Sequence, residues 1–210
     1  MRIFSSKELA EQEKRYRTNF INSLSGFKSL QLLGSINQEG RTNLAVFNSI
    51  FHVGANPPYL GLVVRPDGPE HDTLKNILSS EYYTLNNVCE EFYQKAHQTS
   101  ARYSSGESEF VACGLSEEYI VNFPAPFVKD STIQIGLKVA EVLPVKTNGT
   151  TILIGEVVLI RLNEAYLLAD GTVDLEAAGS ITVAGLDSYH RTQKIARLAY
   201  AKPHVEAKKM

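Results

Sequence analysis

The residues best suited to chemistry stand close together in the stretch 65–73. Arg65 ends an apolar run, a short polar loop follows, and His71, Asp72 and Thr73 open a segment with a helical pattern. A helix N-terminus carries unpaired N–H groups and a partial positive charge, so it favours an anion such as phosphate. A guanidinium can hold two phosphate oxygens at once. The stretch is therefore a candidate anion site.

Each of these residues also has an ordinary structural interpretation. Arg65 can be a solvated charge at the end of a strand, and Thr73 can be a helix-start residue without a ligand. The dipeptide Thr99-Ser100 would, taken alone, be a solvated loop. We find no persuasive Ser-His-Asp order, no glycine-rich nucleotide motif and no paired carboxylates, so any redox chemistry would have to come from a cofactor.

Size and composition indicate one well-cored globular domain. The chain has 210 residues, of which 43% are hydrophobic and 21% charged, with a formal net charge of -2. This balance argues against nucleic acid as a partner. No apolar run approaches the ~20 residues of a membrane span. The N-terminus also lacks the apolar core of a secretion signal, so we expect a cytoplasmic protein.

The cysteines and histidines do not point to a metal. Cys89 and Cys113 are the only two cysteines, and they lack metal-ligand spacing. In a cytoplasmic protein we expect them to remain thiols. The five histidines are scattered along the chain. We therefore expect no metal site.

Strand-like patterns outnumber helical ones. Strands are predicted at 27–37, 43–53, 60–64, 82–88, 131–145 and 151–162, and short helices near 72–78, 90–97 and 107–113. Asn148-Gly149 is a strong hairpin signal, Gly40 suits a turn with positive φ, and Gly155 in mid-strand suggests a bulge or the close approach of a flat group. The pattern favours a closed antiparallel barrel over an alternating α/β fold. Ser5 or Ser6 is expected to cap a short N-terminal helix, with Glu8 near its first turn.

Several segments stand in a recognisable order: Asn43-Leu44-Ala45, Pro57-Pro58, Leu62-Val63-Val64-Arg65-Pro66, Asp72-Thr73-Leu74-Lys75-Asn76-Ile77, Thr99-Ser100-Ala101 and Ile154-Gly155-Glu156-Val157. In this order the chain resembles the flavin reductase-like family of FMN-binding split barrels. The resemblance implies a mainly β, antiparallel Greek-key split barrel with a few short flanking helices. It also implies a homodimer with a flavin at each subunit interface. We divide the chain into a helical arm (1–24), an FMN-binding split-barrel domain (25–190) and a C-terminal tail (191–210).

The resemblance also assigns roles to individual residues. Arg65, His71 and Thr73 would bind the FMN phosphate, the strand at Asn43, Leu44 and Ala45 would lie against the ring, and the loop at Thr99, Ser100 and Ala101 would close over it. Asn48 and Ser49 would supply polar contacts, Asn76 is a second-line candidate, and His190 would help to seat a nicotinamide substrate. Taken in isolation, Asn43 is more simply interpreted as a turn residue and Ala45 as a packing residue. His190 is more simply interpreted as a surface histidine. Many relatives have lysine where this chain has His71, so phosphate affinity here is expected to fall as the pH rises.

The resemblance leaves three functions open. The leading one is an FMN-dependent oxidoreductase that passes reducing equivalents from NAD(P)H, or from another small-molecule donor, to a small acceptor. One branch of the family carries Gly-Asp-His at a nicotinamide site, whereas this chain has Asn148-Gly149-Thr150. That departure favours the alternative, an FMN-binding electron carrier without a nicotinamide site. A structural barrel without a cofactor is the third.

Overall fold

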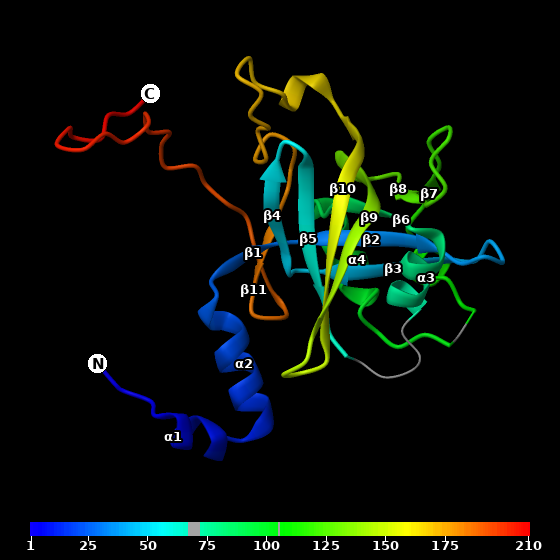
Figure 1. Ribbon diagram of the computed structural model, residues 1–210, viewed down its shortest axis with the longest axis horizontal. Coiled ribbons are helices and arrows are strands. Elements are labelled where there is room, and N and C mark those ends of the chain that lie inside the picture. The colour runs from blue at the N-terminus through cyan, green and yellow to red at the C-terminus, as the bar shows by residue number, and fades with distance from the viewer. Residues whose placement is uncertain (67–71, 105) are drawn as a thin grey trace.

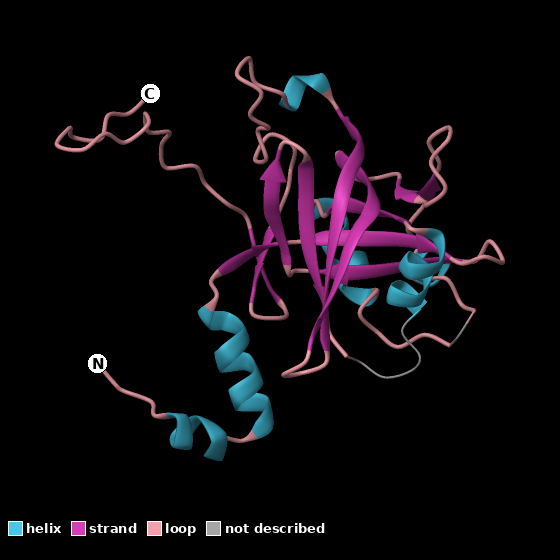
Figure 2. Cartoon of the chain, viewed as in Figure 1, coloured by secondary structure: helices cyan, strands magenta, loops and turns pink. Residues whose placement is uncertain are grey.

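The computed structural model describes residues 1–66, 72–104 and 106–210. Figures 1 and 2 show a barrel of strands with short helices beside it, and both chain ends extend away from it. The strands are β1 (Phe27–Ser29), β2 (Gln31–Ile36), β3 (Thr42–Phe47), β4 (Ile50–Ala55), β5 (Pro58–Val64), β6 (Tyr82–Asn87), β7 (Glu117–Glu118), β8 (Phe127–Val128), β9 (Ile133–Val145), β10 (Thr150–Leu162), β11 (Thr182–Ala184) and β12 (Ser188–His190). The helices are α1 (Ser6–Glu11), α2 (Lys14–Leu24), α3 (Asp72–Ser80), α4 (Tyr93–Gln98) and α5 (Glu109–Ala112), with 3-10 turns η1 (Glu90–Phe92) and η2 (Glu164–Tyr166).

The largest sheet has the strand order β3-β2-β6-β9-β10-β5-β4, and its neighbouring strands are antiparallel. Its two edge strands, β3 and β4, are consecutive in the chain with only Asn48 and Ser49 between them. A link of two residues spans roughly 10 Å at most. The two edges must therefore approach each other at that end, which curls the sheet, and the predicted antiparallel split barrel is confirmed. A smaller sheet of β1, β11 and β12 lies beside it.

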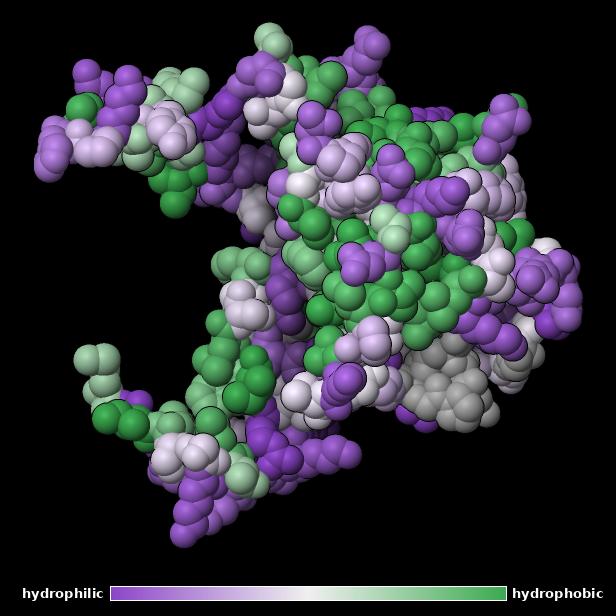
Figure 3. All heavy atoms as spheres, viewed as in Figure 1, coloured by the Kyte–Doolittle hydropathy of each residue, from purple (hydrophilic) through white to green (hydrophobic). Residues whose placement is uncertain are grey.

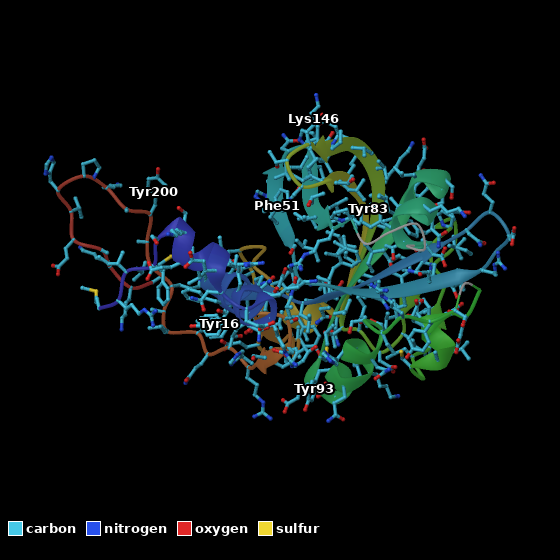
Figure 4. The ribbon with its side chains drawn as sticks, turned by 90° about the horizontal axis from the view of Figure 1, so that it is seen from below. Tyr16, Phe51, Tyr83, Tyr93, Lys146 and Tyr200 are labelled. Carbon is cyan, nitrogen blue, oxygen red and sulfur yellow. The ribbon has the colours of Figure 1, made fainter. Side chains whose placement is uncertain are left out.

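The hairpin of β9 and β10 follows the sequence signals closely. Gly149 takes a φ of +71° in the turn between the two strands. The strand register shifts between Ile154 and Gly155, so the predicted bulge is present. A Cβ atom on Gly155 would lie 2.2 Å from the hydroxyl oxygen of Tyr83, so the flat ring of Tyr83 reaches β10 only because Gly155 has no side chain. Tyr83 is labelled in Figure 4, among the strands of the barrel.

Two strand predictions were wrong, because each predicted strand is divided in two. The segment 27–37 forms β1 and β2, which belong to different sheets. The apolar segment 43–53 was predicted as a single strand, but β3 ends at Phe47 and β4 begins at Ile50. Asn48 and Ser49 form the link, and there the chain passes from one edge of the sheet to the other. Asp72, predicted near the start of a helix, is the first residue of α3.

The core lies in three clusters of buried side chains. One fills the barrel around Tyr83, Leu85 and Leu137, and a second packs α4 and α5 against the sheets around Leu44 and Phe110. The third is built on phenylalanines near β8. In the described part of the chain, no helix is long and apolar enough to cross a membrane. The same residues contain no group of three histidine, cysteine or acidic side chains placed to hold a metal.

The two chain ends are much less packed than the barrel. Ser5 caps α1 and Glu8 completes a capping box with it, as predicted. Neither α1 nor α2 buries a residue. In Figure 1 this N-terminal arm and the C-terminal tail project from the same side of the barrel. The tail is held to the body by an ion pair of 2.6 Å between Arg197 and Asp170.

Candidate functional site

The start of α3 is tied to β3 by a buried hydrogen bond. Asn43 on β3 donates from Nδ2 to the Thr73 hydroxyl oxygen over 2.9 Å. Both residues are largely buried, with 9% and 7% of their surface exposed. Two predicted site residues that stand 30 positions apart are therefore in direct contact. The bond fixes where the N-terminal turn of α3, with its unpaired N–H groups, lies relative to the barrel.

Asn76, one turn further along α3, has a structural role in this arrangement. Its side chain is buried, and Nδ2 donates to the hydroxyl oxygen of Ser35 on β2 at 3.4 Å. A cleft of about 230 Å³ runs along α3 beside Asn43 and Asn76, with Arg41 and Lys75 also in its wall. The contact with Ser35 holds α3 against the sheet, so the main role of the Asn76 side chain is to position this helix.

The outer edge of β3 is partly free. The Leu44 N–H points away from β2 and donates to Oε2 of Glu109, the first residue of α5, at 2.9 Å. Burial raises the pKa of the Glu109 carboxyl, and the hydrogen bond from Leu44 partly offsets that rise. Since alternate residues of an edge strand point the same way, Val46 presents its N–H on the same edge. Sequence reasoning missed Val46, although the alternation of the strand could have identified it.

The link between β3 and β4 carries the next two predicted residues. Asn48 donates from Nδ2 to the carbonyl oxygen of Gly185 at 3.3 Å, and the Ser49 hydroxyl donates to Oδ1 of Asn48 at 3.3 Å. The same Gly185 carbonyl accepts a hydrogen bond of 3.0 Å from Nζ of Lys28 on β1. Lys28 was not predicted as a site residue. A lysine inside the apolar segment Phe27–Leu30 was the available signal.

Arg65 lies immediately after β5, at the same end of the barrel. Its side chain is exposed and donates from Nη2 to Oδ1 of Asn22 on α2 at 2.8 Å. Among the described residues it makes no hydrogen bond to Thr73, the other predicted phosphate ligand. A long exposed side chain has many rotamers, so Arg65 can turn from Asn22 towards a ligand. His71, the third predicted phosphate ligand, falls outside the described residues.

The loop predicted to close over a ring begins where α4 ends. The Thr99 hydroxyl is buried and donates to the Ala96 carbonyl oxygen at 2.8 Å, and the Ser100 hydroxyl donates to the His97 carbonyl oxygen at 2.7 Å. Both hydroxyls therefore bond to their own helix, while Ser100 and Ala101 are exposed. The structure does not bring these three residues into hydrogen bonds with the other predicted site residues.

His190 ends β12 and is exposed. Its ring packs edge-on against Phe27 of β1, with 4.8 Å between the ring centroids. Phe27 immediately precedes Lys28, so His190 lies on the same small sheet as the Lys28 and Gly185 contact. Among the predicted residues, hydrogen bonds therefore join Asn43 to Thr73 and Asn48 to Ser49.

Comparison with known proteins agrees with this architecture. Residues 29–174 match the family model described as the flavin reductase like domain. An uncharacterized protein of Aquifex aeolicus (strain VF5) is 28% identical over 146 residues, which are 69% of this chain and 74% of that protein.

Two solved structures extend the comparison to nearly the whole chain. A candidate flavin reductase with a split-barrel domain from Shewanella frigidimarina NCIMB 400 is 43% identical, with a TM-score of 0.93, and the match covers 96% of this chain and all of that one (100%). Nitrilotriacetate monooxygenase component B from Bacillus cereus is 22% identical with a TM-score of 0.81, over 94% of this chain and 98% of that one. The second match is evidence for the fold alone.

Proposed function

Because the chain belongs to the flavin reductase-like family, we propose that it is an FMN-dependent oxidoreductase. It would pass reducing equivalents from NAD(P)H or another small-molecule donor to a small acceptor. The observation that carries the proposal is the hydrogen bond between Asn43 and Thr73. This bond joins the first turn of α3 to β3, and we propose that the turn binds the phosphate while a flat ring lies against the free edge of β3. A flavin-related oxidoreductase is also what the family match supports.

The donor groups at this end of the barrel fit the parts of FMN. The doubly charged phosphate is suited to the Arg65 guanidinium and to the N-terminal turn of α3. The ribityl chain needs polar partners such as the side-chain amides of Asn43 and Asn48. The ring needs N–H donors near its heteroatoms, and the free edge of β3 offers the Val46 N–H beside the small Ala45 side chain.

When bound, the flavin would supply the redox chemistry by accepting a hydride or electrons and releasing them to the acceptor. The chain's own residues would bind, orient and shield it. Thr73 and Arg65 would hold the charged end, and Asn48 would be fixed for hydrogen bonding by Ser49 on one side and Gly185 on the other. The loop from Thr99 to Ala101 would shield the ring from water.

We further propose that the working unit is a homodimer. Binding pockets for ligands of this size usually hold roughly 300–1,000 Å³, whereas the cleft beside α3 holds about 230 Å³. An isolated helix shorter than about 12 residues is marginal in water, yet α2 buries none of its 11 residues. Figure 3 shows apolar side chains along this arm and on the face of the barrel. A second copy would cover these surfaces and complete the flavin site.

An electron carrier is the second candidate function. It is favoured by the turn between β9 and β10, where Asn148-Gly149-Thr150 stands in place of the Gly-Asp-His of one family branch. Anaerobic mixing of the yellow protein with NADH and with NADPH separates the two functions. Bleaching within seconds supports the oxidoreductase, and persistent colour supports the carrier. A cytoplasmic location stays a prediction.

The direct test of the proposal is FMN binding by the wild type and by Arg65→Ala. We expect the substitution to weaken FMN binding by roughly 1.5–3 kcal/mol, the scale of a hydrogen bond to a charged group. Riboflavin, which lacks the phosphate, should bind both proteins alike. Lys129→Ala, at an exposed cation after β8 and outside the arm, is the control. A wild-type protein that is colourless and takes up no FMN would contradict the proposal.

A further inference from the structure

A second cleft, of about 370 Å³, lies beside the C-terminal end of β10. Its walls come from β7, from the link between β8 and β9, from β9 and from η2, and all of its lining residues belong to the described part of the chain. Pockets for small ligands usually hold roughly 300–1,000 Å³. Unlike the smaller cleft beside α3, this one is therefore large enough within a single chain to hold a small organic molecule.

This second cleft is separate from the proposed flavin site. Thr151, near the start of β10, pairs with Val64, the residue before Arg65. Arg161, in the wall of the cleft, is ten residues further along the same strand, from 151 to 161. At about 3.3 Å per residue this is roughly 33 Å of strand. In Figure 1 the C-terminal end of β10 and the turn that joins β10 to β9 lie at opposite ends of the barrel. A ligand here would not share the FMN contacts of the same chain.

A buried amide orients the arginine of this cleft. Gln134 is only 2% exposed, and its Nε2 donates to the Val128 carbonyl oxygen at 2.7 Å and to Oε2 of Glu118 at 3.2 Å. Its Oε1 accepts a hydrogen bond of 3.3 Å from Nη1 of Arg161, and the same Nη1 lies 2.6 Å from Oε2 of Glu118. These contacts use one nitrogen of a group that has five N–H donors. They therefore fix the guanidinium and do not occupy its Nε and Nη2 donors.

The charged residues of the lining leave one positive charge in excess. Lys129 and Arg161 are cationic, and among these described lining residues Glu118 is the only acid. The hydrogen bond from Arg161, followed by that from Gln134, lowers the pKa of the Glu118 carboxyl, so this group is ionised at neutral pH. A single excess charge complements a monoanion better than it complements a doubly charged phosphate.

The residues at the end of β10 provide contacts for the uncharged part of a ligand. Oδ1 of Asn163 accepts a hydrogen bond of 3.0 Å from the Ala165 N–H, which orients the amide and leaves its Nδ2 as a donor. Leu162 and Tyr166 are both half-buried and line the cleft with an aliphatic and an aromatic side chain. A molecule with an anionic head and a flat apolar body would use both kinds of contact.

We propose that this cleft binds a small organic monocarboxylate. Its carboxylate would lie between Lys129 and Arg161, and its apolar body would pack against Leu162 and Tyr166. The Nε and Nη2 donors of an arginine share one edge of the guanidinium and can hold a carboxylate through two parallel hydrogen bonds. The site goes beyond the proposed redox function, and it does not depend on whether the chain binds FMN.

Benzoate is the probe, with benzamide as an uncharged analogue of similar shape and inorganic phosphate as the dianion. Each is titrated into the full-length protein while the amide signals are followed by NMR. We expect benzoate to shift the signals of residues 129–134 and 161–166, and to bind about tenfold more tightly than benzamide or phosphate. Benzoate that leaves both segments unshifted, or that binds no better than benzamide, would overturn the proposal.

Charge variants test the assignment of the two ends of the cleft. Lys129→Met should weaken benzoate binding about tenfold, and Lys129→Arg should restore most of it. Glu118→Gln removes the opposing charge and should strengthen benzoate binding severalfold. Lys146→Met is the matched control, because Lys146 is an exposed lysine in the turn between β9 and β10, at the other end of the strands (Figure 4). Benzoate affinity that is the same in wild type, Lys129→Met and Glu118→Gln would also overturn the proposal.

Discussion

The contact between Tyr83 and Gly155 allows a stability prediction that can be worked out from the structure. Tyr83 is fully buried (0% exposed), and its hydroxyl has no hydrogen-bond partner among the described residues. Burial also raises the pKa of Tyr83, so the hydroxyl remains neutral. A methyl group on Gly155 would lie 2.2 Å from that hydroxyl oxygen and 3.0 Å from Cδ2 of Leu137. Both distances are shorter than van der Waals contact.

Gly155→Ala should therefore destabilise the protein. Overpacking a core costs about 1–3 kcal/mol, which exceeds the ~0.4–1 kcal/mol gained when a glycine is removed from the unfolded chain. Tyr83→Phe should be neutral or stabilising, because an unsatisfied buried hydroxyl costs about 1–3 kcal/mol. In the Tyr83→Phe background the closest remaining ring atom is Cζ, at 3.0 Å from the added methyl group. The cost of Gly155→Ala should then fall by about 1 kcal/mol.

The assay is urea unfolding of the wild type, the two single variants and the double variant, with the free energy of unfolding extrapolated to water. A coupling energy of about 1 kcal/mol or more is expected. Effects that add within about 0.3–0.5 kcal/mol would refute the reasoning, because they would mean that the added methyl group does not meet the hydroxyl. A large loss of stability in Tyr83→Phe alone would likewise show that the hydroxyl has a partner.

Three further outcomes follow from other contacts. Burial raises the pKa of Glu109 above the usual value of 4.5. The stability of the wild type should therefore fall relative to that of Glu109→Gln as the pH rises above about 4.5. A difference in urea midpoint between the two proteins that is the same at acid and neutral pH would contradict this. Ile21→Asp, on the exposed apolar face of α2, should give monomers with weakened FMN binding, whereas an unchanged mass by light scattering would exclude the arm from the interface. The hydrogen bond from Arg197 lowers the pKa of Asp170 to about 2, so the tail should stay attached across the physiological pH range. Asp170→Asn should speed tryptic cleavage in residues 197–210. An unchanged cleavage rate would mean that the ion pair plays no part in holding the tail.

Much of the barrel could be predicted from local patterns. The hairpin at Asn148-Gly149 and the bulge at Gly155 follow from backbone chemistry that neighbouring residues dictate. The break at Asn48-Ser49 did not show in the sequence, because the apolar pattern continues on both sides of it. β3 pairs with β2 whereas β4 pairs with β5, and only the folded chain establishes which strands pair.

The candidate site could be predicted only in part, because some of its contacts join residues that are far apart in the sequence. Asn43 and Thr73 were both identified from the sequence, and the fold joins them. The hydroxyls of Thr99 and Ser100 bond to carbonyl groups of α4, and these bonds depend on where that helix ends. Lys28 was missed because a lysine in a short strand normally indicates a solvated edge, whereas its contact with Gly185 joins residues 157 positions apart.

The hydrogen bond between Leu44 and Glu109 has a consequence for the behaviour of the protein at high concentration. An unpaired strand edge is a template on which other chains can add strands and aggregate. On β3 that position is occupied by a carboxylate from α5, which places an acidic group where an incoming strand would have to present its own carbonyl. The Glu109 carboxylate therefore protects this edge of the barrel from strand addition by other copies of the chain.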